Sequence, residues 1–251
     1  MKMKHAILVA AFIAVAARGD NLYIVPVAGS VTGALGQYST VIRAVNPNVT
    51  DVTLTCDGVF PMFSEATSCA GLSEMIPPAA THEGVIIGGL CCSGGAAFDN
   101  VPVGALALRS TDTLELRSDV ILTTATTASW QPMEIGRAWI PGGREALIDR
   151  AIAFDSSFGT NLFLVNPNPI PIHVTYRAGL GSADVIVPAK RTLYVPLSIK
   201  FPCPRGCGSV LPFTGNGFGL VLRSDFDYFA SAISFSNFLP PVVRIAVPIS
   251  P

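Results

Sequence analysis

The four residues Val-Asn-Pro-Asn occur twice in this chain of 251 residues, at Val45–Asn48 and at Val165–Asn168. Each copy follows an apolar run and precedes a run in which apolar and polar residues alternate. Proline cannot donate a hydrogen bond to a β-ladder and restricts the residue before it, so each corner should end a strand. Asparagine tolerates turn geometry and bonds to nearby backbone. The motif therefore predicts one strand-to-strand turn, present twice.

The sequences around the two corners also match. The first match places Ser39–Thr55 over Gly159–Tyr176. Three more follow in the same order: Met75–Ile87 over Val185–Leu197, Leu106–Ser110 over Leu220–Ser224, and Arg137–Pro141 over Arg244–Pro248. The offset between the copies drifts along the chain, as expected when strands are retained and loops vary in length. We interpret the pattern as an internal duplication.

Strand signals dominate both copies. Short runs of Val, Ile, Leu, Thr and Phe are separated by Gly, Pro, Asn and Asp. Leu114 and Leu116 keep the period of two that a sheet with one buried face requires. Regular strands without helices between them favour antiparallel sheets packed face to face. We therefore predict an all-β chain with two tandem antiparallel β-sandwich (immunoglobulin-like) domains, residues 21–142 and 146–251, with a boundary near Pro141–Leu147.

Residues 1–17 have the features of a secretory signal peptide. Lys2 and Lys4 precede an apolar run, Ala6–Ala17, that ends in small residues. This run is too short to cross a bilayer comfortably. An uncleaved membrane anchor is the alternative. We expect a secreted or cell-surface protein, periplasmic or extracellular, that does not span a membrane.

Composition narrows the range of partners. Half of the residues are apolar, 13% are charged, and the formal net charge is −1. A balance so close to neutral gives no reason to expect nucleic acid as a partner. The abundant apolar residues must line a core or an interface. Because the linker is short, we expect the two domains to pack on one another, and self-association is a second expectation.

Six cysteines follow the N-terminal run: Cys56, Cys69, Cys91, Cys92, Cys203 and Cys207. Export and an even number favour disulfides over free thiols. Their spacing contains no Cys-x-x-Cys pair, which argues against a zinc site. We pair Cys203 with Cys207, which close a short loop. The pairing of the other four stays open among three arrangements, with a slight preference for Cys91 and Cys92 joining the Cys56 and Cys69 region, because a bond between neighbouring cysteines is strained.

The sequence offers few candidates for catalysis. His82 and His173 are the only histidines after the N-terminal run, and no Gly-x-Ser-x-Gly motif is present. The alternation around His173 points it to the outer face of a sheet. We therefore predict no catalytic, cofactor-binding or metal-binding residue and no cofactor. A secreted hydrolase with an unrecognised site is one alternative, and an outer-membrane β-barrel is another, although proline interrupts many of the strands.

Aromatic residues gather near the C-terminus, and two interpretations of them are open. They either form an exposed set that stacks on sugars or docks a partner, or they pack in the core. Alternation places neighbouring members on opposite faces of a strand. The set comprises Phe213, Phe218, Phe226, Tyr228, Phe229, Phe235 and Phe238.

The arrangement resembles the tandem immunoglobulin-like repeats of secreted proteins from environmental bacteria. Those repeats carry a threonine, an apolar strand, an Asn-Pro turn and a later Leu-x-Leu-x-Ser strand, which correspond here to Thr40 and Thr160, the two corners, and the matched Leu-Arg-Ser segments. The resemblance extends from about Leu22 to Pro248. It implies a surface or extracellular module of unassigned function, and it carries over no catalytic residue.

Together these features predict a secreted, non-enzymatic protein that acts in adhesion, envelope structure or ligand binding. The expected partner is a cell-envelope component, a carbohydrate or another protein.

Overall fold

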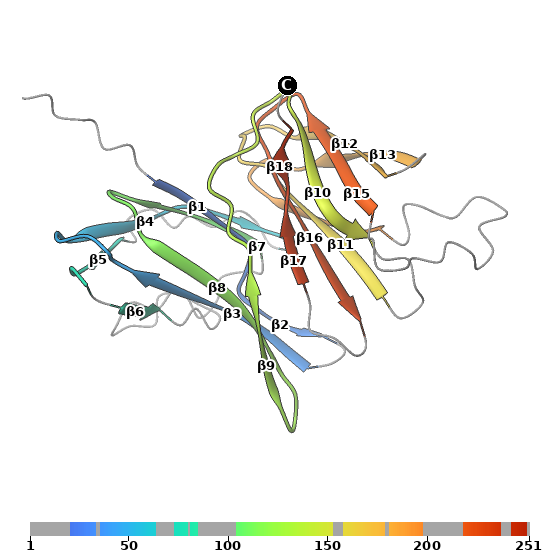
Figure 1. The fold of residues 1–251 in the computed structure, drawn as a ribbon. Coiled ribbons are helices and arrows are strands. Elements are labelled where there is room, and N and C mark those ends of the chain that lie inside the picture. Colours follow the sequence, from blue (N-terminus) through green and yellow to red (C-terminus); the bar gives the residue numbers. More distant parts are fainter. Residues whose placement is uncertain are drawn as a thin grey trace, which may run out of the picture.

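A computed structural model of the chain describes residues 21–33, 36–63, 73–79, 81–84, 104–152, 158–178, 181–197, 218–236 and 242–249. This part is built almost entirely of β-strands arranged in several sheets (Figure 1), which confirms the prediction of an all-β chain. The proposed signal peptide, residues 1–17, lies outside the described residues. The strands β1–β9 form what we call the first half, and β10–β18 the second half.

In the first half, two sheets pack face to face around a shared core. One has the order β1-β7-β4-β5, and the other contains β9-β8-β3-β2, with β6 also pairing with β3. The strands are β1 (Asn21–Ala28), β2 (Ser30–Gly33), β3 (Gly36–Val45), β4 (Val52–Pro61), β5 (Ser73–Ile76), β6 (Thr81–Gly84), β7 (Gly104–Ser110), β8 (Glu115–Thr123) and β9 (Ala128–Met133). Tyr23, Val52 and Leu106 from one sheet meet Ile42 and Leu116 from the other.

The second half is built in the same way. One sheet has the order β13-β12-β15-β10-β18, and the other contains β14-β11-β16-β17. The strands are β10 (Glu145–Ile152), β11 (Phe158–Val165), β12 (Ile172–Ala178), β13 (Gly181–Val187), β14 (Thr192–Pro196), β15 (Phe218–Ser224), β16 (Phe229–Ser236), β17 (Val242–Ile245) and β18 (Val247–Pro248). Ile148 and Leu220 from the first sheet pack with Leu162 and Ala230 from the second.

The strand orders of the two halves agree place by place. The order β1-β7-β4-β5 corresponds to β10-β15-β12-β13, and β6-β3-β8-β9 corresponds to β14-β11-β16-β17. The matched segments Leu106–Ser110 and Leu220–Ser224 lie on β7 and β15, which hold the same place. The last match does not correspond in this way, because Arg137–Pro141 follows β9 whereas Arg244–Pro248 extends over β17 and β18.

The turn after β5 shows a second difference from the sequence alignment. Ala79 and Lys190 both have a positive φ, 51° and 54°, a conformation that few non-glycine residues adopt. The alignment had placed Ala79 over Ala189 instead. Ladder pairing agrees with the structural match, since Val52 pairs with Ile76 just as Ile172 pairs with Val187. The Pro-Ala pair that the two segments share, Pro78–Ala79 and Pro188–Ala189, is therefore shifted by one residue between the two turns.

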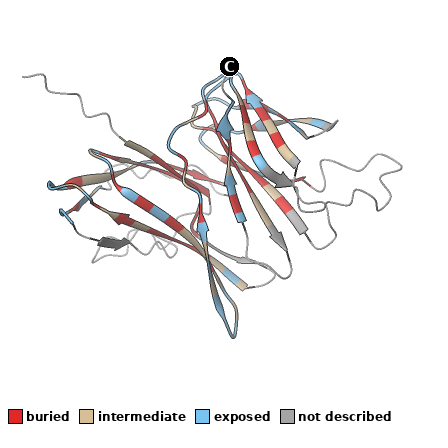
Figure 2. Ribbon diagram, viewed as in Figure 1, coloured by how far each residue is buried: buried red, intermediate tan, exposed pale blue. Residues whose placement is uncertain are grey.

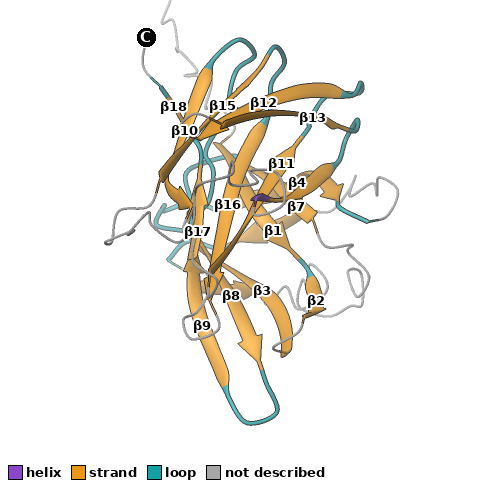
Figure 3. Cartoon of the chain, turned by 90° about the vertical axis from the view of Figure 1, so that its right-hand side faces the viewer, coloured by secondary structure: helices purple, strands orange, loops and turns teal. Residues whose placement is uncertain are grey.

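A single parallel pairing joins the halves into one sheet. Val243 on β17 lies opposite Met133 on β9, so that β14-β11-β16-β17 continues into β9-β8-β3-β2. Figure 3 shows β16, β17, β9, β8 and β3 along this sheet. The two halves thus share one nine-stranded sheet, while each keeps its own second sheet.

A third apolar cluster, which we call the interface cluster, lies between the halves. Its buried members are Ile24, Phe60, Ala105 and Ala107 from the first half and Val165 and Phe229 from the second. Trp139 packs against this cluster and meets the Phe60 ring edge-on, with 5.5 Å between the ring centroids. The residues Tyr23–Val25 are all buried, because β1 faces the first core on one side and the interface cluster on the other (Figure 2).

The Thr192 side chain hydrogen-bonds across this interface. The Thr192 hydroxyl on β14 donates to the Phe60 carbonyl at 2.6 Å and accepts from the Ala105 N–H at 3.1 Å. Thr192 is buried, so its two bonds to backbone groups of the first half are made away from bulk water. The second half is thereby fastened to β4 and β7 of the first.

The first Asn-Pro-Asn corner is a buried hydrogen-bond network. The Asn46 amide nitrogen donates to the carbonyls of Thr50 and Ile76, each at 2.8 Å. Its oxygen accepts from the backbone N–H and the side-chain amide of Asn48, each at 2.9 Å. The Asn48 amide also donates to the Thr113 carbonyl at 2.7 Å. Asn46 is fully buried and its bond to Ile76 is buried too, whereas the outlying bond from Asn48 to Thr113 is exposed.

The second corner repeats each of these bonds and adds one, from the Asn166 amide to the Pro188 carbonyl at 3.0 Å. The Asn166 amide donates to the carbonyls of Ile170 at 2.7 Å and Val187 at 3.1 Å. The Asn168 N–H and side-chain amide donate to the Asn166 oxygen, at 2.8 and 2.9 Å, and the Asn168 amide also donates to the Asp227 carbonyl at 2.7 Å. As predicted, β3 and β11 end directly before the two corners.

The corner network predicts the effect of an isosteric change. Asn46→Asp replaces two donated hydrogen bonds with an oxygen facing the Thr50 and Ile76 carbonyls, so we expect the free energy of unfolding in urea to fall by about 3 kcal/mol. Asn166→Asp should do the same. Val49→Ala, at a side chain that is 92% exposed, is the control and should change stability by less than about 0.5 kcal/mol. Unchanged stability in both aspartate variants would contradict this role.

The bridge between the halves gives a second test. Thr192→Val keeps the shape of the side chain but removes the hydroxyl, leaving the Ala105 N–H and Phe60 carbonyl without it, so unfolding should cost about 1–3 kcal/mol less. Thr192→Ser retains the hydroxyl and should recover most of that loss. A valine variant as stable as the wild type in urea denaturation would show that the bridge contributes nothing.

Candidate functional site

Two hollows on the surface are the candidate binding sites. The first, which we call the seam hollow, has a volume of about 400 Å³ and lies where β10, β17 and β18 meet the segment after β9. The second, which we call the arginine hollow, has a volume of about 360 Å³ and lies beside β8. The arginine hollow is lined by Arg43, Leu116, Arg117, Ser118, Asp119, Pro132, Met133, Ile135 and Arg137.

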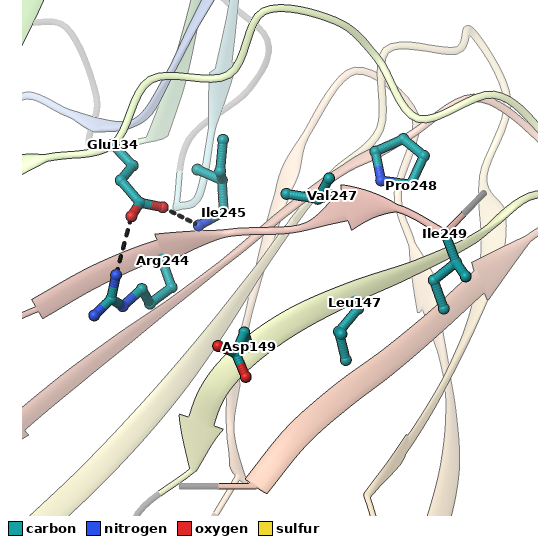
Figure 4. A pocket seen from close by; sticks show the side chains of 8 residues that line it. All are labelled: Glu134, Leu147, Asp149, Arg244, Ile245, Val247, Pro248 and Ile249. Atoms are coloured by element: carbon teal, nitrogen blue, oxygen red, sulfur yellow. Dashed lines mark hydrogen bonds and ion pairs between the residues drawn. The ribbon is translucent and has the colours of Figure 1, made fainter. Parts of the chain in front are cut away.

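The polar groups of the seam hollow serve mainly to hold the chain together. The Glu134 carboxylate accepts from Arg244 Nη1 at 3.2 Å and from the Ile245 N–H at 3.1 Å (Figure 4). Leu147, Val247, Pro248 and Ile249 complete a largely apolar lining, with Asp149 to one side. Glu134 thereby ties the segment after β9 to β17. An ion pair this exposed contributes about 0–1 kcal/mol.

The arginine hollow forms where β8 loses its neighbour. In the described part of the chain, β8 pairs with β9 only from Ser118 to Thr123, and the pair Ser118–Met133 is the last. The residues Glu115–Arg117 keep their ladder to β3 alone. An open sheet edge therefore borders the hollow, and side chains from both faces of β8 reach it.

Two of its three arginines are held in place by aromatic rings. The Arg43 guanidinium donates to Asp119 Oδ2 at 2.8 Å and lies 5.1 Å from the centre of the Trp130 ring. The Arg137 guanidinium lies 4.4 Å from the centre of the Tyr23 ring. Such stacking uses the face of a guanidinium and leaves N–H donors in its plane.

The charges in the arginine hollow do not cancel. Three arginines line it, and Asp119 is the only carboxylate among the lining residues. Arg117 is exposed and makes no ion pair within the described residues. The chain as a whole carries a formal charge of −1, so the positive charge of this hollow is a local property and does not follow from the composition. The hollow can attract and orient an anion.

A buried hydroxyl adds a polar group to the arginine hollow. Ser118 is 2% exposed and lines the hollow, yet its Oγ finds no hydrogen-bond partner in the described structure. A buried hydroxyl without a partner costs about 1–3 kcal/mol, so such groups are few in folded proteins. Ser118 therefore brings a hydroxyl with unused bonding capacity to the arginine hollow.

Sequence reasoning did not find the arginine hollow. Arg43, Arg117 and Arg137 stand singly in the sequence, and no motif known for anion binding surrounds them. Strand register brings the first two together, since Arg43 pairs with Arg117 between β3 and β8. The third arrives only because the chain passes this edge after leaving β9. The alternation at Leu114 and Leu116 indicates one buried face on this strand, but nothing local indicates which residues lie beside Arg117.

The residues that the sequence singled out are spread over the molecule. His173 lies exposed on β12, as the alternation predicted. His82 lies on β6, and its side chain is outside the described residues, as are Cys69, Cys91, Cys92, Cys203 and Cys207. Cys56 lies on β4 beside a shift in the pairing with β7, and its side chain is not free.

Arg109 makes its ion pair across the sheet. Its Nε donates to Asp57 Oδ1 at 2.8 Å, on the neighbouring strand β4.

Asn48, which belongs to an Asn-Val-Thr glycosylation pattern, uses its amide nitrogen for bonds to Asn46 and Thr113. A glycan at Asn48 would displace at least one of these bonds, so the corner network and glycosylation compete for the same nitrogen.

The late aromatic residues pack inside the molecule where they are described, except Phe226, which is 45% exposed. Tyr228 belongs to the core of the second half, and its neighbour Phe229 belongs to the interface cluster. Alternation did place the two rings on opposite faces. The face that holds Phe229 is covered by the first half of the same chain, with Gly136 against the ring.

No metal-ligand group appears in the described ranges, where no three His, Cys, Asp or Glu residues come together. Among the same residues there is also no helix long and apolar enough to cross a membrane. Comparison of the chain with protein-family models, with curated proteins and with solved structures gave no match.

Two buried tyrosines provide a matched prediction. The Tyr23 hydroxyl donates to the Leu114 carbonyl at 3.1 Å and accepts from the Leu114 N–H at 2.8 Å, whereas the buried Tyr228 hydroxyl has no partner within the described residues. Tyr23→Phe should therefore lower the free energy of unfolding by about 1–3 kcal/mol, and Tyr228→Phe should leave it unchanged or raise it. Equal losses in urea denaturation would contradict the assignment.

Tyr228 also makes stability depend on alkaline pH. Burial, with a smaller contribution from the Glu145 carboxylate, raises the pKa of Tyr228 above its ordinary value. The folded state keeps this proton where the unfolded chain loses it, so its stabilising effect is complete below pH ~10 and declines above it. Unfolding free energies between pH ~9 and ~11 should fall less steeply in Tyr228→Phe than in the wild type. Identical slopes would contradict this.

Proposed function

We propose that the chain is a secreted, non-enzymatic protein of two tandem immunoglobulin-like β-sandwich repeats, which binds a component of the cell envelope. The observation that carries this proposal is the pair of matching halves fastened into one body. The same strand order and the same corner network occur in both halves. The interface cluster and the Thr192 bridge then fix one half against the other. Such a body presents surface hollows in a fixed geometry, which suits binding.

The matching halves support an internal duplication. The two corner asparagines are both fully buried and donate to equivalent carbonyls, at the ends of β5 and β13. Ala79 and Lys190 adopt the same unusual backbone conformation in the following turn. Two unrelated sandwiches can arrive at the same strand order more easily than at the same unfavourable backbone conformation in the same turn. The division into domains 21–142 and 146–251 accompanies this part of the proposal.

Export and disulfide bonding belong to the same proposal. The charged start and apolar run of residues 1–17 support secretion. The Cys56 side chain is not free, which supports a disulfide within the first repeat. Cys203 and Cys207 would close a loop of the second repeat. Each bridge would stabilise the fold by about 2–4 kcal/mol.

Co-sedimentation tests the proposed function. The purified mature protein is mixed with cell envelopes from the producing organism and centrifuged, with an unrelated protein of similar size as the control. We expect the protein to pellet saturably and to be displaced by excess unlabelled protein. Protein that stays in the supernatant at every envelope concentration would overturn the envelope-binding proposal.

A further inference from the structure

We propose that the arginine hollow binds an oxyanion, the chemical group shared by the carboxylate of an acidic sugar and by a phosphate. This inference rests on the proposed function, because it names the chemistry by which an envelope component would be recognised. The hollow is lined by three arginines, one aspartate and one buried serine.

The net charge of the lining selects anions. Asp119 neutralises Arg43, to which it is bonded at 2.8 Å, and this leaves Arg117 and Arg137 without a countercharge among the lining residues. Both are exposed, so a ligand reaches them without rearrangement of the fold. A cation would be repelled here, and a neutral group would leave both charges uncompensated.

The arginines are also oriented before a ligand arrives. Arg43 is fixed between Asp119 and the Trp130 ring, and Arg137 lies over Tyr23. Tyr23 is itself held by both backbone groups of Leu114. A contact with an aromatic ring does not consume the N–H donors of a guanidinium, so donors remain for an oxyanion, which arginine binds with two parallel hydrogen bonds. Less side-chain freedom is lost on binding to arginines held in this way.

Ser118 supplies the observation that points to a ligand independently of charge. Its hydroxyl is nine-tenths buried, lines the hollow and has no partner within the described residues. Its Oγ is covered and lies on the face of β8 opposite Arg117, so an oxyanion oxygen would accept this unmade hydrogen bond once the lining side chains move aside. The hollow, at about 360 Å³, is near the lower end of the volumes of ligand pockets, which suits a single sugar residue or a phosphate group.

Calorimetric titration with simple probes tests this inference. Galacturonate and inorganic phosphate are titrated separately into the whole purified protein at low ionic strength, and galactose serves as the uncharged control. We expect saturable binding of at least one anion, no binding of galactose, and weaker binding as salt is raised. The stronger of the two anions identifies a carboxylate or a phosphate as the natural group.

Variants locate the site. Arg117→Gln and Arg137→Gln should each weaken anion binding about five- to tenfold, and Ser118→Ala should weaken it about threefold. Arg223→Gln is the matched control, because Arg223 is also an exposed strand arginine but lies on β15 in the other half. It should leave the affinity unchanged.

Three results would overturn the inference: no binding of either anion, undiminished binding in both Arg117→Gln and Arg137→Gln, or an equal loss in Arg223→Gln. Far-ultraviolet circular dichroism confirms that each variant is folded. Failure of this inference can be distinguished from failure of the proposed function, because anion binding and envelope binding are measured separately. Envelope binding that persists in Arg117→Gln and Arg137→Gln would remove the arginine hollow as the recognition site while leaving envelope binding in place. Anion binding without envelope binding would do the reverse.

Discussion

The structure depends on a buried asparagine that joins the two sheets of each half. Asn46 follows β3 in one sheet, and its amide bonds to Ile76 at the end of β5 in the other. Asn166 does the same between β11 and β13. A fully buried amide is tolerated only when its bonds are made, so this side chain fixes where the sheets meet and where both strands end. The neighbouring Asn48 and Asn168 extend the network to the carbonyls of Thr113 and Asp227. One Asn-Pro-Asn tripeptide thus links the two sheets at one end of each half.

The second constraint is the apolar surface that each half leaves on its outside. Ile24, Phe60 and Phe229 point away from their own cores and bury one another in the interface cluster. A strand such as β1, covered on both faces, must be apolar at consecutive positions, which accounts for much of the high apolar content of the chain. The positive hollow beside β8 lies apart from this buried surface, where β9 turns away toward the second half. The packing of the halves thus leaves an open edge at which charged side chains gather.

Local pattern was sufficient for the strands and for the corners, because the two Asn-Pro-Asn segments directly follow the ends of β3 and β11 and alternation reports one buried face. It was not sufficient to predict which part of the chain covers each face of a strand. Tyr228 and Phe229 were correctly placed on opposite sides, but only the fold shows that the outer side is covered by the first half. The match of Arg137–Pro141 with Arg244–Pro248 joined a connecting segment to a strand, because both contain the same residue types. The arginine hollow had no sequence signal, since it depends on the register between β3 and β8 and on the path of the chain after β9.

The central claim is that the two halves form one body, with matching internal architecture and a shared apolar interface. Differential scanning calorimetry of the whole mature protein tests it most directly. The account predicts one unfolding transition whose calorimetric and van't Hoff enthalpies agree, with a ratio of about 1, because neither half can unfold without exposing the interface cluster of the other. Two separate transitions, each with the enthalpy of one half, would contradict it.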